Sequence, residues 1–230
     1  MSMVTQNILD LLEYCIFDGE LTEENFQEKI LDNLPENFQY DWFYGASKCV
    51  LIPKGADYVI KIPFNGMESY EELYDEDNDE YYGGEWYFEN YTGCQHGEGW
   101  DYCLAEAILY HKAKQAKILD VFCKTKLIGR VNNHPIYTQS RAIPFSWYYL
   151  KKEKDYESER SKKIQNYCKK KELPQLNSIW LADAFEYYGE RRFNKIMNFI
   201  KKERLNDFHT DNIGYIGHQP ILIDFSGFLS

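Results

Sequence analysis

The chain has 230 residues and a formal net charge of −11, from 26 Lys or Arg and 37 Asp or Glu. This length is typical of one domain or of two lobes. A hydrophobic content of 44%, with 20 Tyr and 14 Phe, excludes a disordered chain. The negative charge would repel the phosphates of a nucleic acid duplex, so nucleic-acid binding is not expected.

The six cysteines are scattered and form no Cys-x-x-Cys pair, which predicts neither a zinc site nor a disulfide framework. The N-terminus lacks a basic start followed by an apolar segment, and no run of apolar residues is long enough to cross a bilayer. We therefore expect a cytoplasmic protein without a membrane partner.

Two helices are predicted at the N-terminus, over residues 5–17 and 22–31. Ile8 and Leu12 recur at helical spacing in the first helix, and Phe26 and Ile30 do so in the second. Amphipathic helices usually serve a core, so we expect residues 1–39 to brace the sheet that follows.

Residues 42–64 predict apolar strands around a polar turn at 54–57, and Lys61 lies in the last of these strands. An exposed lysine at the edge of a sheet is the ordinary interpretation of such a residue. Residues 67–99 then interleave acidic with aromatic side chains. This segment indicates a solvated insert whose aromatic rings dock on the lobe; the alternatives are an acidic surface for a cationic substrate or basic partner, and a nucleic-acid mimic.

A helix is predicted over residues 100–119, with Leu104, Ile108 and His111 on one face and Glu106 beside that face. A hairpin follows over residues 126–140. Residues 176–200 predict two helices that are broken near Gly189.

The C-terminal segment places oxygen-bearing side chains at the ends of a short apolar hairpin. Asp207 precedes Asn212 by five residues, and the second strand of the hairpin leads into Asp224. Two strands thus hold three such side chains near one point, an arrangement suited to a divalent cation bound with a phosphate chain.

This segment resembles the catalytic core of the protein-kinase-like superfamily and is similar to aminoglycoside and choline phosphotransferases. Asp207, His209 and Asn212 match the family's Asp-x-His-x-x-Asn loop, and Asp224-Phe225-Ser226 matches its degenerate Asp-Phe-Gly motif. Upstream, Val59-Ile60-Lys61 resembles the strand that carries the phosphate-binding lysine of kinases.

The resemblance implies an α+β, protein-kinase-like two-lobed fold. Residues 40–144 would form a nucleotide-binding N-lobe with an antiparallel sheet and the acidic, aromatic insert at 67–99. Residues 145–230 would form a small, truncated helical C-lobe. The sequence ends three residues after Gly227, where a full kinase continues, so we expect the acceptor-binding half to be reduced.

The resemblance also implies roles for five residues that bear charge or bind metal. Asp207 would accept the proton of the attacking hydroxyl, and Lys61 would hold the nucleotide phosphates while Glu106 pairs with Lys61. Asn212 and Asp224 would hold Mg²⁺.

The nucleotide would meet two backbone segments as well. Gly45 and Ser47 would cover its phosphates in the turn between the first two strands, and Ala142 and Ile143 would face adenine at the hinge. A rival register that makes Asp211 the base is disfavoured, because the position five residues later is Ile216 rather than Asn.

The function expected from this set is an ATP- and Mg²⁺-dependent phosphotransferase with an unknown small-molecule or protein acceptor. The alternative is a catalytically inactive, pseudokinase-like binding module, or an acidic interaction protein that acts through residues 67–99.

Overall fold

The chain is an α+β protein whose elements fall into two compact units. The first unit comprises Met1–Tyr102 and Lys126–Thr138, and the second comprises Cys103–Thr125 and Gln139–Ser230. The computed structural model describes residues 3–17, 20–45, 48–64, 66–75, 80–90, 102–132, 134–149, 158–205 and 207–225. The segment predicted as N-lobe, 40–144, therefore contributes to both units.

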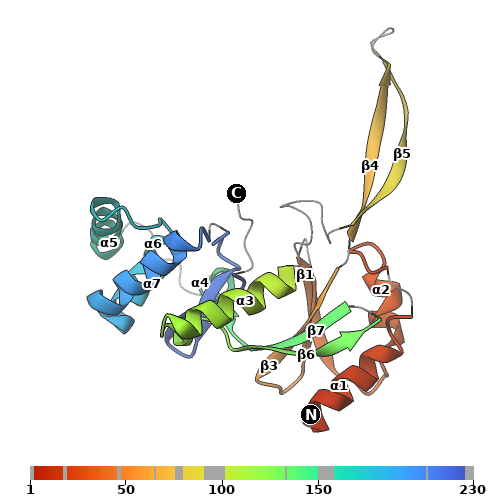
Figure 1. Cartoon of the computed structure of the whole chain (residues 1–230), viewed down its shortest axis with the longest axis horizontal. Coiled ribbons are helices and arrows are strands. Elements are labelled where there is room, and N and C mark those ends of the chain that lie inside the picture. Colours follow the sequence, from red (N-terminus) through yellow and green to blue (C-terminus); the bar gives the residue numbers. More distant parts are fainter. Residues whose placement is uncertain are drawn as a thin grey trace. The chain divides into compact units, whose positions relative to one another are not determined.

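The first unit is built on a five-stranded sheet (Figure 1). Its strands are β1 Tyr40–Gly45, β2 Lys48–Pro53, β3 Tyr58–Pro63, β6 Thr125–Val131 and β7 His134–Ser140. They lie in the order β1-β2-β3-β7-β6, and the pairs β1–β2 and β2–β3 are antiparallel. The predicted apolar strands and the hairpin over 126–140 are thus confirmed, and β3 is an interior strand.

One face of this sheet packs against the N-terminal helices. Helix α1 spans Met3–Glu13 and α2 spans Phe26–Lys29, with a 3₁₀ turn at Leu31–Asn33. Their apolar residues share a core with alternate residues of β2 and β3, because successive side chains of a strand point to opposite faces. The two predicted helices exist, but both are shorter than the predicted ranges. Members of this core include Ile8, Leu12, Phe26, Ile30, Cys49, Leu51, Ile60 and Ile62.

The segment predicted as an insert contains a two-stranded ribbon. Strands β4 Gly66–Asp75 and β5 Glu80–Asn90 pair antiparallel along almost their whole length, with a register shift between Glu72 and Tyr74 (Figure 1). Sequence analysis predicted no strands in this segment. The predicted docking of its aromatic side chains lies outside what the structure describes.

The second unit is mainly helical. Its helices are α3 Tyr102–Gln115, α4 Phe145–Tyr149, α5 Glu159–Lys170, α6 Ser178–Tyr188 and α7 Glu190–Lys202, with a 3₁₀ turn at Leu119–Val121. Strands β8 Ile143–Pro144, β9 Ile213–Ile216 and β10 Gln219–Leu222 form a small sheet in the order β10-β9-β8. The predicted break between α6 and α7 is confirmed, since Gly189 has a φ of 74° that favours glycine.

The predicted buried face of α3 is wrong. Ile108 is 47% exposed and His111 is exposed, whereas Leu109 and Ala113 are buried in the core of the second unit. Glu106 lies on this buried side of the helix and is itself fully buried. None of the helices in the described ranges is both long enough and apolar enough to cross a membrane.

Candidate functional site

The loop between α7 and β9 is closed by the side chain of Asn212. Its Nδ2 donates to the carbonyl oxygen of Asp207 at 2.8 Å and to Oδ2 of the same residue at 3.1 Å. The backbone N–H of Asn212 also donates to the His209 carbonyl at 3.0 Å. Because both donors of the amide group serve Asp207, the amide oxygen is left as the acceptor of this side chain.

The backbone of Asn212 places Asp224 in the same loop cluster. The carbonyl oxygen of Asn212 accepts from the N–H groups of Ile223 at 2.8 Å and Asp224 at 3.3 Å. The β9–β10 hairpin sets this geometry, since Ile213 pairs with Leu222 immediately before the two strands diverge. The structure therefore brings together three residues that the sequence predicted as a set: Asp207, Asn212 and Asp224.

His209 lies near two carboxylates at this loop. Its Nε2 is 3.9 Å from Oδ1 of Asp207, and its Nδ1 is 3.7 Å from Oδ2 of Asp211. Asp211 is largely exposed and accepts a hydrogen bond from the Ser146 hydroxyl of α4. Within the described part of the chain, the Asn212 side chain bonds Asp207 and not Asp211, so the two aspartates occupy different environments.

The donors at this loop are those that Mg²⁺ prefers. Asp224 offers a carboxylate and Asn212 offers an amide oxygen, and Mg²⁺ is commonly held by one or two carboxylates together with phosphates and water. Among the described residues, no group of three or more His, Cys, Asp or Glu side chains could hold a metal by itself. Asn212 and Asp224 are thus two oxygen-bearing residues in one loop cluster.

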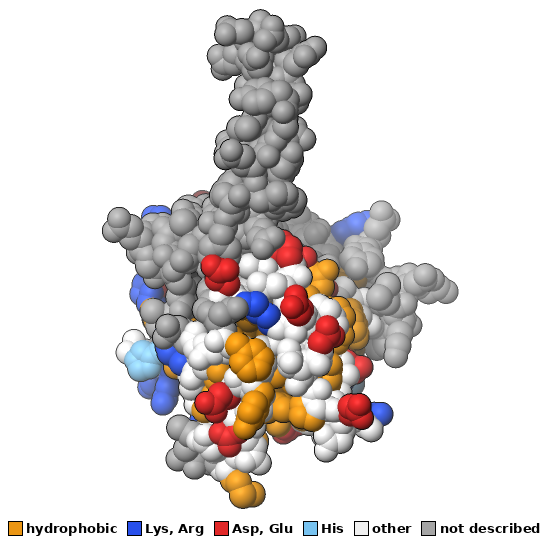
Figure 2. Space-filling model, turned by 90° about the vertical axis from the view of Figure 1, so that its right-hand side faces the viewer, with side chains coloured by type: hydrophobic (Ala, Val, Ile, Leu, Met, Phe, Trp, Pro, Cys, Tyr) orange, Lys and Arg blue, Asp and Glu red, His pale blue; other side chains and the backbone are white. Residues whose placement is uncertain are grey.

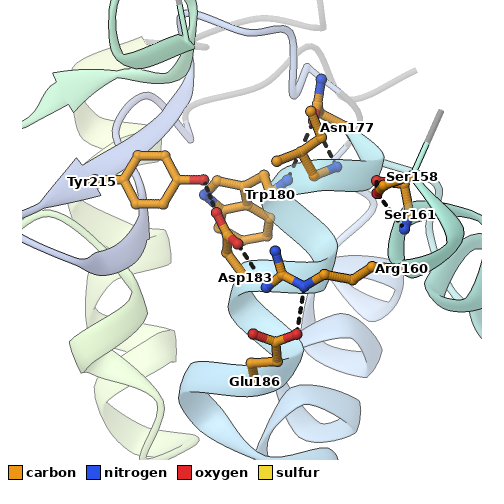
Figure 3. A network of polar contacts seen from close by, with 9 residues as sticks. Ser158, Arg160, Ser161, Asn177, Trp180, Asp183, Glu186 and Tyr215 are labelled. Atoms are coloured by element: carbon orange, nitrogen blue, oxygen red, sulfur yellow. Dashed lines mark hydrogen bonds and ion pairs between the residues drawn. The ribbon is translucent and has the colours of Figure 1, made fainter. Parts of the chain in front are cut away.

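Helix α6 fixes β9, the strand that starts directly after Asn212. The Tyr215 hydroxyl donates to Oδ2 of Asp183 at 2.6 Å (Figure 3). Trp180 Nε1 donates to the Gly214 carbonyl at 3.2 Å. Asp183 also forms an ion pair with Arg160 of α5 at 2.8 Å. These bonds hold the strand by both its backbone and a side chain, which positions the loop that precedes it.

Ile143, one of the two predicted hinge residues, lies against the same strand. Ile143 pairs with Tyr215, and a Cβ built on Gly214 would lie 2.2 Å from the Ile143 carbonyl oxygen. Ser146 then donates its backbone N–H to the Thr210 carbonyl at 3.2 Å. Sequence reasoning assigned no role to Gly214, although its position inside an apolar strand is a signal of close backbone approach.

Glu106 is held in a buried polar cluster of the second unit. Its Oε1 accepts from Gln139 Nε2 at 2.9 Å, and the same nitrogen is 3.0 Å from Thr125 Oγ1. A buried carboxylate is tolerated only with such polar partners. Sequence reasoning missed Gln139. A polar residue at a position of a predicted strand that faces inward could have indicated this buried contact.

Lys61 is buried in the first unit, so its interpretation as an exposed edge lysine is wrong. Only 3% of it is exposed, and its Nζ lies 5.9 Å from the centre of the Tyr137 ring on β7. Lys48 of β2 is equally buried. Val50 of β2 pairs with Lys61 and shares its face of the sheet, and Lys48 shares the face of Val50 because the two are two residues apart on one strand. Sequence reasoning missed Lys48, which follows the turn directly.

The remaining predicted residues receive less support from geometry. Gly45 ends β1, and a Cβ added there would meet no atom within 4 Å. Ser47 lies outside the described residues. Lys61 belongs to the first unit and Glu106 to the second, so the ion pair between them stays a prediction.

The chain was compared with known protein families and with curated proteins, and it matches none of either.

Proposed function

We propose that the chain is an ATP- and Mg²⁺-dependent phosphotransferase with a kinase-like, two-lobed fold. The observation that carries this proposal is the Asn212 clamp. One residue holds Asp207 through its side chain and Asp224 through its carbonyl oxygen. A base and two metal-binding groups held close together are the parts that phosphoryl transfer requires.

Asp207 is the group proposed to receive the proton of the acceptor hydroxyl. About a third of its side chain (35%) is exposed, and one carboxylate oxygen is oriented by the Asn212 amide. The other oxygen, Oδ1, lies 3.9 Å from Nε2 of His209 and is the one proposed to meet a substrate hydroxyl. Orientation of this kind matters because the catalytic gain comes from positioning rather than from covalent chemistry.

Asn212 and Asp224 are the residues proposed to hold Mg²⁺. Bound there, the ion would neutralise the charge of the nucleotide phosphates. Lys61 adds positive charge on the buried face of its sheet, with Glu106 proposed as its partner in the nucleotide-bound state. Lys48 shares that face, so we assign it to the same phosphates.

Backbone groups complete the proposed nucleotide site. The turn that holds Gly45 and Ser47 would cover the phosphates, and the hinge at Ala142 and Ile143 would bond the adenine edge. The acceptor remains a small molecule or a protein side chain with a hydroxyl group.

Calorimetry with ATP, with and without Mg²⁺, tests the binding half of this proposal. Asp224→Ala should lose the Mg²⁺-dependent part of the affinity, whereas the matched variant Asp211→Ala should keep it. Lys48→Met should weaken ATP far more than adenosine, because it removes a contact to phosphate only. Equal Mg²⁺-dependent binding by wild type and Asp224→Ala would contradict the metal site.

Radiolabel transfer from γ-labelled ATP tests the chemical half. Asp207→Asn should bind Mg-ATP as the wild type does and lower transfer by about 10²–10⁴-fold, the usual range for loss of a general base. Autophosphorylation serves as the readout, since Tyr, Ser and Thr are plentiful. If both proteins bind Mg-ATP and neither transfers phosphate, the chain is a nucleotide-binding module and not a phosphotransferase.

A further inference from the structure

Strand β1 lies at the edge of the five-stranded sheet and presents aromatic side chains to solvent. Its inner side pairs with β2, and its outer side pairs with no other strand in the described ranges. Trp42, Phe43 and Tyr44 are 42%, 43% and 45% exposed. Three consecutive half-exposed aromatic residues on an open edge form an unusual surface, because such edges attract other strands.

The aromatic rings of this edge are held in place by α2. Phe26 lies 5.2 Å from Trp42 and 5.1 Å from Tyr44, measured between ring centres, and the Trp42 and Tyr44 rings stack at 6.0 Å. Phe26 is buried, so it anchors the exposed pair to the core. The surface is therefore ordered before a partner arrives, which lowers the entropic cost of binding.

The opposite edge of the same sheet, strand β6, is protected against pairing with other strands by charged side chains and a covering helix. Strand β6 carries Lys126 and Arg130. Leu9 of α1 also packs directly over Gly129, where an added Cβ would lie only 2.7 Å from the leucine side chain. Strand β1 has neither Lys nor Pro, and its single charged residue is Asp41. The contrast indicates that the β1 edge is kept open for binding.

The segment that forms β1 and the helices packed against its sheet is strongly acidic in sequence. Residues 1–45 contain ten Asp or Glu and a single Lys. Figure 2 looks at the side that carries α1 and α2, where red carboxylates lie among orange apolar side chains. A second copy of this chain would bring the same charge and be repelled, as would a nucleic acid. A basic partner would be attracted.

We propose that the β1 edge binds an extended, basic segment of a partner protein by strand addition. Backbone hydrogen bonds along β1 would supply affinity. Side chains on alternate sides of the added strand would meet Trp42 and Tyr44 on one face and Phe43 on the other. Lys or Arg of the partner would face the surrounding carboxylates. This activity does not depend on phosphoryl transfer.

Fluorescence anisotropy with labelled nonapeptides tests this proposal on the full chain. The peptides to be tested alternate Lys or Arg with Val, Ile or Tyr. One control set replaces the basic residues with Glu, which removes the positive charge. A second control set carries N-methyl groups on alternate backbone nitrogens, which removes hydrogen-bond donors. Basic peptides should bind, with an affinity that falls as salt rises. Trp42→Thr, which retains strand propensity, should weaken binding by about tenfold or more.

Two controls separate this result from misfolding and from self-association. Trp147→Ala removes another exposed tryptophan, on α4, and should bind the peptides as the wild type does. Circular dichroism should show both variants folded. The proposal is overturned if no basic peptide binds, if the Glu or N-methylated control sets bind equally well, or if Trp42→Thr has no effect. Sedimentation that reveals a dimer broken by Trp42→Thr would assign the edge to a second copy instead.

Discussion

At the scale of single residues, the candidate site depends on two small features beside β9. Asn212 uses the N–H donors of its amide group to close the loop onto Asp207. Gly214 allows the Ile143 carbonyl to approach the strand more closely than any side chain would permit. The resemblance predicted that Asp207 and Asn212 belong to one loop but not the hydrogen bonds between them, and the second feature depends on a strand pairing that no local pattern reveals.

Gly214→Ala should destabilise the second unit. The new Cβ would lie 2.2 Å from the backbone oxygen of Ile143, and backbone cannot yield as a flexible side chain does. The free energy of unfolding should fall by at least about 2 kcal/mol, as for other overpacked sites. Urea denaturation measures this change. Gly45→Ala is the matched control, since nothing lies within 4 Å of its added Cβ; equal midpoints for both variants would contradict the β8–β9 pairing.

At the scale of elements, periodic patterns predicted the existence of most strands and helices but not every buried face. The hairpins around residues 132 and 217 and the break at Gly189 have strong local signals, namely turn residues between apolar runs. The face of α3 that is buried is not the one that carries Ile108 and His111, which sequence analysis predicted to be buried. Glu106 accepts a hydrogen bond from Gln139, which also bonds Thr125, and such compensation for a buried carboxylate arises only in the folded structure.

Helix α6 depends on a cap at its first turn. Oδ1 of Asn177 accepts from the N–H groups of Ile179 at 3.0 Å and Trp180 at 3.3 Å (Figure 3). Asn177→Ala should lower the free energy of unfolding by about 1 kcal/mol, the usual cost of losing such a cap. Asn177→Asp keeps an acceptor and should retain most of the stability. Thermal melting measures both variants, and similar losses for the two would show that the cap contributes little.

At the scale of the whole molecule, each unit has its own core, and each core encloses thiols. Cys15 and Cys49 are buried in the first unit and Cys168 in the second. Burial raises the pKa of Cys15 and Cys168 to about 11 and that of Cys49 to about 12. These thiols are therefore poor nucleophiles in the folded protein.

The protein should lose stability as the pH rises above the ordinary thiol pKa of 9.0. Above that value the unfolded chain releases thiol protons that the folded chain keeps, so the unfolded state gains relative stability until the folded-state pKa values of about 11–12 are reached. Burial raises the pKa of the Tyr188 hydroxyl as well, which acts in the same direction.

Urea denaturation at about pH 8 and about pH 10.5 measures this loss, which depends on proton release from the unfolded chain. Replacing Cys15, Cys49 and Cys168 together with Ala should lower stability at the lower pH, because cavities form. The same replacement should reduce the further loss between the two pH values, because three of the titrating groups are gone. An unchanged pH dependence would show that the buried thiols do not contribute to alkaline unfolding.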